Sequence, residues 1–382
     1  MNVSLSNETR TLTEAERLDW LRLARSENVG PITFFALLNR FDTPAAVLDA
    51  LPTLARRGGR RRPIKVCSRA AAEREIEDVD RLGGRLIALG EPAYPPALAA
   101  IDDPPPVIAL RGRADLLVSD CIAVVGARNA SANGLHFAER LATDLGAAGL
   151  TVVSGMARGI DARAHTGALA TGTVAVMGGG VDVVYPKENR SLFERLLDEG
   201  AVIAEAPLGT VPVGRHFPRR NRIIAGLSRG VVVVEGAARS GSLITARLAL
   251  EQGREVMAVP GSPLDPRASG PNRLIRQGAT LVENVDHVLE ALAEGGRQVL
   301  GETRRPWPED AALGQPEDDD APANARESVI ALLGPSPVPV DMLVRQSRLT
   351  PAMVATILLE LELAGSLERQ PGNRVSLSEP AA

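Results

Sequence analysis

The strongest constraint on the fold is a series of short apolar runs that recur roughly every 25 residues between positions 121 and 284. Continuous apolar runs, without the alternation of a half-exposed sheet, are typical of parallel strands that helices cover on both faces. The runs are CIAVVGA (121–127), LTVVSG (150–155), TVAVMGGG (173–180), AVIAEA (201–206), VVVVEG (231–236), EVMAVPG (255–261) and ATLVEN (279–284).

The segments between these runs have helical composition, as in 134–148 and 243–252. Strands that alternate with helices predict an α/β domain with a Rossmann-like, doubly wound, mostly parallel sheet. In such sheets the ligand binds at the carboxyl ends of the strands, where the strand order reverses. The loops after the strands are therefore the first place to look for function.

A chain of 382 residues is too long for one ordinary domain. We predict a small helical domain, similar to a SAM or helix-hairpin-helix module, and an extended Rossmann-like domain. An acidic, proline-rich linker and a winged-helix domain follow. The boundaries predicted for these four parts are 1–80, 81–298, 299–324 and 325–382.

The two terminal domains show recognisable helix starts. Thr13 and Glu16 fit a capping box, and Thr350 with Pro351 fits the N-cap and first position of a helix. Three helices followed by a hairpin with its tip at 372–373 predict a winged helix. Its third helix contains no lysine or arginine. A helix that reads a DNA duplex needs such basic residues to contact the phosphates. We therefore expect a degenerate winged helix that packs against another part or a protein partner.

Composition narrows the class of protein. Hydrophobic residues make up 45% and charged residues 24%, which excludes wholesale disorder. There is no apolar run long enough for a membrane span and no N-terminal secretory pattern. Two cysteines cannot build a disulfide framework, and no His/Cys spacing suits a metal. These features predict a reduced, cytoplasmic protein that uses no metal, cofactor or membrane.

Net charge does not decide whether the chain binds nucleic acid. The total is −4, and the segment 301–322 alone carries seven acids and two bases. The remaining chain therefore carries −4 − (−5) = +1. Only local clusters of charge can point to a polyanion.

The first two strand-end loops suit a phosphate. Their glycines allow close backbone approach, and the following helix start attracts anions. Arg128 stands beside the first helix start, where it either contacts a phosphate or is a plain surface arginine. Asp161 is expected to cap the helix after the second loop. The candidate binding residues of these loops are Gly126, Arg128, Ser131, Gly155, Arg158 and Gly159.

The third and fifth loops extend this pattern. In the third, three glycines (178–180) lead to Lys187 and Asn189, which offer hydrogen-bond donors. The fifth places small hydroxyl residues at a strand-to-helix junction. Its candidates are Ser240, Gly241, Ser242 and Thr245. His165, after the second loop, is either a structural histidine or a general base, and no nucleophile accompanies it.

The fourth loop gives the clearest signal. From position 211 to 230 the chain holds five arginines, one phenylalanine and no acid. Arginines pair with phosphates and an aromatic ring stacks on bases, a combination typical of nucleic-acid binding. The stretch also fits a helix start with solvated arginines, and both interpretations can hold together. Its candidates are Phe217, Arg219, Arg220 and Arg222. Five such loops predict a track for several phosphates.

Six ordered motifs resemble the DNA-processing protein A family, also called DprA or Smf. They are GARNAS, SGMARGIDARAH, GGGVDVVYPKEN, EAPLGTVPVGRHFPRRNRIIAGLS, VVEGAARSGSLITA and AVPGSPLDPRASGPNRLIRQGA. The resemblance covers about 121–290, and EPAYPPAL and DPPPVIALRG extend it upstream. One such loop alone would carry little weight, whereas the ordered set is highly specific.

The resemblance implies a protein that is not an enzyme. Family members bind single-stranded DNA that enters the cell during natural transformation, protect it and load the RecA recombinase onto it. They work in the cytoplasm as homodimers joined through the Rossmann-like domain. The family usually has serine where Ala127 stands, and we expect a small effect from this difference. The residues that match DNA-associated positions of the family are Arg128, Lys187, Arg219, Arg220 and Arg222.

Two alternatives remain open. A nucleotide phosphoribohydrolase has a Rossmann-like fold and a PGGxGTxxE motif with a catalytic glutamate. Here 240–245 reads SGSLIT, and Arg247 and Leu248 follow in place of a glutamate, so no general base is evident. A pure assembly scaffold is the other alternative, and it predicts that Arg128 and 219–222 can be lost without weaker DNA binding.

Overall fold

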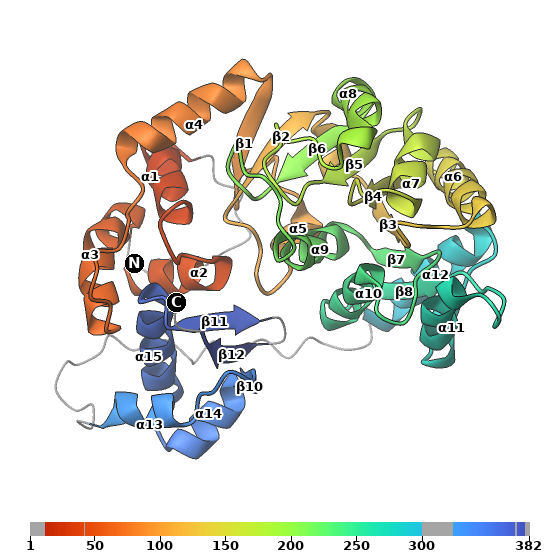
Figure 1. The fold of residues 1–382 in the computed structure, drawn as a ribbon. Coiled ribbons are helices and arrows are strands. Elements are labelled where there is room, and N and C mark those ends of the chain that lie inside the picture. Colours follow the sequence, from red (N-terminus) through yellow and green to blue (C-terminus); the bar gives the residue numbers. More distant parts are fainter. Residues whose placement is uncertain (1–11, 42, 300–323, 371–372, 379–382) are drawn as a thin grey trace. The chain divides into compact units, whose positions relative to one another are not determined.

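The protein is described by a computed structural model that covers residues 12–41, 43–299, 324–370 and 373–378. These residues form two compact units. The first unit combines the N-terminal residues up to Glu73 with the C-terminal domain, and the second begins at Arg74 and contains the sheet (Figure 1). Residues 300–323, nearly all of the expected linker, lie outside the described residues.

The second unit is built on a nine-stranded sheet in the order β1-β2-β6-β5-β4-β3-β7-β8-β9. Strands β3 to β9 are parallel to one another, and all seven apolar runs of the sequence form strands. The predicted Rossmann-like α/β fold is therefore confirmed. The parallel strands are β3 Cys121–Val125, β4 Thr151–Ser154, β5 Thr173–Val176, β6 Ala201–Ala204, β7 Gly230–Val233, β8 Glu255–Ala258 and β9 Thr280–Leu281.

Two antiparallel strands extend this sheet beyond the expected seven. Strand β2 (Val107–Gly112) pairs with β6, and β1 (Gly84–Ala88) pairs with β2. The prolines of segment 91–112 predict an extended chain that lies against the next domain, whereas its last six residues are a strand of the sheet itself. Helix α5 (Pro96–Ala99) lies between the two strands in sequence and contacts α9.

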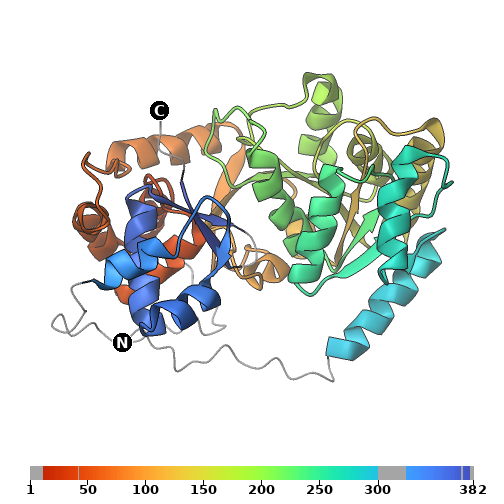
Figure 2. The same ribbon diagram turned by 60° about the horizontal axis from the view of Figure 1, so that its bottom comes forward.

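Helices cover both faces of the sheet (Figures 1 and 2). Along β3 the side chains alternate: Ala123 and Val125 pack into one apolar cluster with residues of α9 and α10, and Ile122 and Val124 pack into another with α6, α7 and α12. Burial on both faces explains why the strand sequences are apolar throughout. The helices are α4 Arg69–Arg81, α6 Ala132–Ala147, α7 Ile160–Ala168, α8 Arg190–Glu199, α9 His216–Leu227, α10 Gly241–Glu251, α11 Ser269–Arg276 and α12 Val285–Val299.

The strand order reverses at β3. Strands β4, β5 and β6 follow one another on one side of it, and β7, β8 and β9 follow on the other. The loops after β3 and after its neighbours β4 and β7 therefore leave the sheet at its topological switch point. Three short 3-10 turns also belong to this unit: η1 Asp115–Leu117, η2 Lys187–Asn189 and η3 Pro266–Ala268.

The first unit contains the N-terminal helices and a winged helix. The capping box of Thr13 and Glu16 is present, and the Thr350 side chain caps α15 as predicted. The three-stranded sheet has the order β10-β12-β11. The elements are α1 Glu14–Ala24, α2 Pro31–Arg40, α3 Pro44–Arg57, α13 Ala325–Ala331, β10 Val338–Pro339, α14 Val340–Ser347, α15 Pro351–Leu363, β11 Leu367–Gln370 and β12 Arg374–Leu377.

Within the described ranges, every helix is too short or too polar to cross a lipid bilayer. Across the same residues, no group of three His, Cys, Asp or Glu side chains is arranged to hold a metal ion.

Candidate nucleic-acid interface

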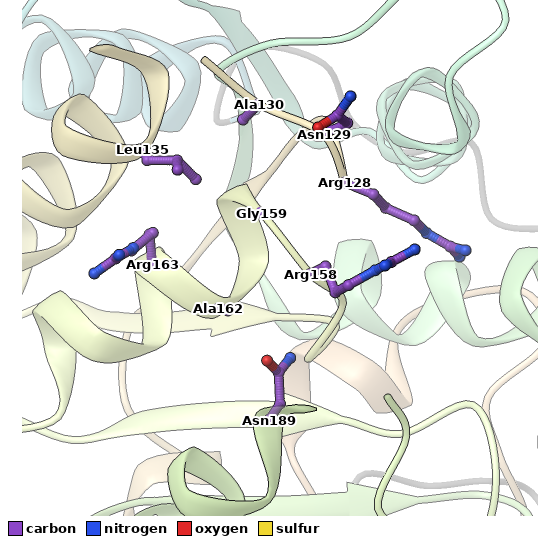
Figure 3. A pocket seen from close by; sticks show the side chains of 9 residues that line it. All are labelled: Arg128, Asn129, Ala130, Leu135, Arg158, Gly159, Ala162, Arg163 and Asn189. Atoms are coloured by element: carbon purple, nitrogen blue, oxygen red, sulfur yellow. The ribbon is translucent and has the colours of Figure 1, made fainter. Parts of the chain in front are cut away.

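The loops after β3 and β4 border a pocket of about 310 Å³ (Figure 3). Three arginines line it and no carboxylate does, so the pocket favours an anion. The figure shows the Arg128 and Arg158 side chains extending toward the same side, whereas Arg163 lies beside Leu135. The full lining is Arg128, Asn129, Ala130, Leu135, Arg158, Gly159, Ala162, Arg163 and Asn189.

An aromatic pair adjoins the pocket at Arg128. The guanidinium carbon of this exposed arginine lies 5.0 Å from the centre of the Phe217 ring, within the range of a cation–π interaction. The Tyr185 ring lies 5.6 Å from the Phe217 ring, tilted by 40°, and Tyr185 is 43% exposed. Both rings leave part of their surface accessible. Two accessible rings beside an arginine provide surfaces on which bases stack.

Two glycines explain how the first two loops come so close together. A Cβ atom on Gly159 would lie 2.2 Å from the carbonyl oxygen of Ala127, and the residue has a φ of +79°. A Cβ on Gly126 would lie 2.6 Å from the Ile160 side chain. Only glycine fits either position without displacing the backbone or the core. These glycines therefore allow the two loops to approach each other, and Gly159 lines the pocket.

The third loop is joined to the second by an asparagine. Asn189 donates hydrogen bonds from Nδ2 to the carbonyl oxygens of Met156 (2.9 Å) and Ala157 (3.3 Å). Its donors therefore hold the loops together, although it also lines the pocket. Lys187 is exposed at the start of the same turn. Arg158 is exposed as well, with Glu188 at the limit of an ion pair, 4.0 Å away.

The arginines at the start of α9 have different environments. Arg219 is exposed, whereas Arg220 and Arg222 are each 5% exposed. Arg220 donates to the carbonyl oxygens of Gly155 and Val176, at the ends of β4 and β5. The structure thus gives Arg220 and Arg222 internal roles, which differs from the direct DNA contact predicted for them. The reason is helical geometry, because only Arg219 faces away from the core.

Arg222 is part of a buried ion cluster. It donates from Nη2 to Glu205 (2.6 Å) and from Nη1 to the carbonyl oxygen of Asp103 (2.7 Å), and its Nε lies 3.3 Å from the Asp103 carboxylate. Burial raises the pKa of the Asp103 carboxyl, and the Arg222 charge opposes this shift. The cluster connects α9 to β6 and to the segment before β2.

A second buried charge lies directly beneath the loops. Asp161 accepts a hydrogen bond from the Ala157 backbone at 3.3 Å. Burial raises the pKa of its carboxyl, and the positive charge of Arg220 opposes this shift. Burial likewise lowers the pKa of Arg220 to about 10, and the Asp161 charge raises it. These two opposite charges support the ends of β4 and β5 from inside. The helix cap expected of Asp161 is wrong, because the N-cap of α7 (Ile160–Ala168) is Gly159, without a side-chain cap, and Asp161 lies inside the helix.

The start of α6 already holds a carboxylate of the protein. Glu235, in the loop after β7, accepts hydrogen bonds from the Ser131 hydroxyl (2.6 Å) and the Ser131 amide (2.9 Å). Ser131 also caps α6 by accepting from the Gly134 amide. Because Glu235 occupies the anion-binding end of the helix, Ser131 orients the Arg128 loop instead of offering a free phosphate site.

The fifth loop is not brought into the arginine-lined pocket. Ser240 caps α10 and lies 2.8 Å, oxygen to oxygen, from Ser242. Ser242 and Thr245 are buried, with 7% and 2% exposure, and Gly241 is exposed. The hydroxyl groups of Ser242 and Thr245 thus face the interior of the domain, and Gly241 is the accessible candidate of this loop.

His165 is a structural histidine. It is fully buried on α7, and its Nδ1 lies 2.9 Å from the Thr173 hydroxyl. Its Nε2 is buried without a hydrogen-bond partner among the described residues. Burial, followed by the charge of Arg220, lowers its pKa to about 3. The side chain is therefore neutral at pH 7 and sealed from any substrate, which leaves the general-base alternative without support.

This burial predicts a loss of stability in acid. The unfolded chain protonates His165 near pH 6.5, whereas the folded chain does so only near pH 3, so unfolding is favoured as the pH falls below 6.5. At up to 1.36 kcal/mol per pH unit, His165 alone lowers the free energy of unfolding by about 2 kcal/mol between pH 6.5 and 4.5. Urea unfolding of His165→Gln should show a shallower dependence on pH than the wild type. The exposed His136→Gln is the matched control, and identical pH dependence of all three proteins would contradict the prediction.

Three residues of this region were not predicted from the sequence. Tyr185 stands in the motif GGGVDVVYPKEN, where an aromatic residue followed by proline and lysine could have marked it as a binding residue. Arg163 lines the pocket one turn into α7, although its Nη1 also lies 3.1 Å from Glu139. Glu235 had no local signal, because Ser131 is 104 residues away.

Comparison with known proteins decides the family. The family model for DNA recombination-mediator protein A matches residues 85–293, more than half of the chain. The chain belongs to this family, known as DprA or Smf. Models for the DprA-like N-terminal HHH domain and the DprA winged helix domain match 14–77 and 314–373. The resemblance noted from the motifs is thus confirmed, together with the helical and winged-helix parts.

Individual DprA and Smf proteins agree with this assignment. Protein Smf of Escherichia coli is 41% identical over 298 residues, which cover 76% of this chain and 77% of Smf. The X-ray structure of DprA from Streptococcus pneumoniae has a TM-score of 0.58 and 34% identity, and covers 74% of this chain and 98% of that one. A DprA structure from Helicobacter pylori, described for its single-stranded DNA binding mode, has a TM-score of 0.51 and 25% identity, and covers 55% and 96%.

Proposed function

We propose that this DprA-family protein binds single-stranded DNA along the strand-end loops of its Rossmann-like domain. The observation that carries the proposal is the exposed Arg128 stacked on Phe217, with the Tyr185 ring alongside. In this proposal Arg128, Arg158, Lys187 and Arg219 contact phosphates, and the two rings stack on bases. A neighbouring pocket lined by arginines without carboxylates supports a polyanionic ligand.

The proposal extends to the wider role that the family resemblance implies. The protein protects incoming single strands in the cytoplasm and loads the RecA recombinase onto them during natural transformation. It works as a homodimer through the Rossmann-like domain. The edge strand β9 supports the homodimer, because an edge strand presents backbone groups with which a second copy can pair. Leu281 on this strand is 39% exposed.

The chemistry of the site favours binding over catalysis. A phosphoribohydrolase needs a carboxylate at the ligand, and none lines the pocket. Two carboxylates of the neighbouring loops serve the protein itself: Glu235 accepts hydrogen bonds from Ser131, and Asp161 is buried beside Arg220. These assignments leave neither carboxylate facing a ligand.

The test is a titration of the protein into fluorescent oligo-dT and into a duplex of equal length at two salt concentrations. We expect at least tenfold tighter binding to the single strand, because accessible rings stack only on unpaired bases. The affinity should fall as salt rises, because binding releases counterions. Equal affinity for the duplex would contradict the proposal. Release of free base from nucleoside monophosphates would instead support the enzyme alternative.

A further inference from the structure

We propose that the third helix of the winged-helix domain, α15, has the N-terminal helical module (α1–α3) of the same chain as its binding partner, in place of duplex DNA. In a DNA-reading winged helix the corresponding helix enters the major groove. Here it lies alongside α2 and α3 (Figures 1 and 2), all within the first unit.

The apolar residues of α15 divide between two clusters. Val354, Leu358 and Leu361 belong to the core of the winged helix itself. Leu359 and Leu363 belong instead to the apolar cluster of the N-terminal module and are 4% and 0% exposed. Residues four apart lie on one face of a helix, so α15 has a second apolar face that a winged helix does not need for its own folding.

Polar contacts fix the register of this packing. Glu362 on α15 accepts hydrogen bonds from the Thr33 hydroxyl and from Arg369 Nε (2.8 Å). Asn28 Nδ2 donates to the carbonyl oxygen of Leu363 at 3.1 Å, which satisfies a free carbonyl at the helix end. Arg326 on α13 donates to the carbonyl oxygens that end α3. Each of these polar groups therefore meets a complementary group.

Charge complementarity also selects the helical module over DNA. From Pro351 to Leu363, α15 carries two carboxylates and no basic residue. The charges of Arg40, Arg57 and Arg326 lower the pKa of the Glu360 carboxyl, although its burial raises the pKa more. These arginines attract α15, whereas a phosphate backbone would repel it.

A single glycine gives a precise test of this contact. Gly58 ends α3 with φ −65° and ψ 0°, a conformation that alanine also adopts. A Cβ atom there would lie 1.8 Å from the Glu360 carbonyl oxygen of α15. The Gly58→Ala change is thus compatible with the N-terminal module and incompatible with the close approach of α15.

The experiment is hydrogen exchange of the full chain with Gly58→Ala. We expect exchange of α15 amides to accelerate at least tenfold, while amides of the Rossmann-like domain stay within twofold of the wild type. Gly334→Ala is the matched control, because no atom lies within 4 Å of its added Cβ. Leu359→Asp disrupts the same contact from α15, at a residue outside the winged-helix core. This second variant keeps the test valid if Gly58→Ala misfolds α3. Unchanged α15 exchange in both variants would overturn the proposal.

Duplex binding provides an independent readout. Gly58→Ala and Leu359→Asp should each bind a 20-base-pair duplex within twofold of the wild type, because α15 lacks basic residues even when it is released from the N-terminal module. A tenfold gain of salt-sensitive duplex binding would overturn the proposal, because α15 would then be a DNA-reading helix held in check by the N-terminal module.

Discussion

Replacing Arg222 with alanine is expected to lower the free energy of unfolding by about 3–5 kcal/mol. The change removes the cation from a buried cluster and leaves the carboxylates of Glu205 and Asp103 facing each other without it. The Arg222 side chain is only 6% exposed and the two carboxylates are mostly buried, so water replaces the lost donors only in part. For a domain of this size each kcal/mol corresponds to about 2–4 °C, so Tm should fall by roughly 6–20 °C in a thermal melt.

Arg219→Ala is the matched control, because Arg219 stands on the same helix but is exposed. The two variants should show opposite phenotypes: Arg219→Ala keeps its Tm and loses part of its affinity for single-stranded DNA, whereas Arg222→Ala loses stability. A second change, Glu205→Gln in the Arg222→Ala background, should recover part of the loss by removing one of the two negative charges that Arg222 balanced. A Tm of Arg222→Ala within 2 °C of the wild type would rule out the structural role.

The parallel sheet was predictable because its signal is local. Each strand is a continuous apolar run, and the run itself records burial on both faces. The antiparallel strand β2 (Val107–Gly112) follows five residues of aspartate and proline (102–106), and its pairing with β6 is set by a segment nearly 100 residues later. Nothing within 91–112 specifies that partner, so the sequence showed an extended segment without its place in the sheet.

The arginines of α9 show the same limit at the site. Arg220 stands three, four and seven residues before Ile223, Ile224 and Leu227, which is the spacing of one buried helix face. Helical periodicity could therefore have placed Arg220 inside. Arg222 had no comparable signal, because its acidic partners lie 17 and 119 residues away in the chain. Residue type and position within a loop predict charge, whereas burial of that charge depends on distant partners.

Removing the Phe217 ring should weaken single-stranded DNA binding in a way that separates stacking from phosphate contact. Phe217→Ala is expected to raise Kd by roughly 5- to 150-fold, the equivalent of 1–3 kcal/mol for one stacked base. The dependence of log K on log salt should stay unchanged, because no phosphate contact is lost. Arg128→Ala should also raise Kd, and it should reduce the magnitude of that slope by about 0.7, one phosphate on a single strand. Both are measured by fluorescence titration of oligo-dT at four salt concentrations.

The double variant tests whether ring and guanidinium act together. The guanidinium carbon of Arg128 lies 5.0 Å from the centre of the Phe217 ring, so each side chain holds the other in position. The losses of binding free energy in Phe217→Ala and Arg128→Ala should therefore not add. We expect the double variant to bind at least threefold more tightly than the product of the single effects predicts. Phe217→Leu is the control for packing, since leucine fills the space against Gly178 but offers no aromatic face. If Phe217→Leu binds like the wild type, or if the two losses add fully, base stacking on a ring held by Arg128 is not the basis of binding.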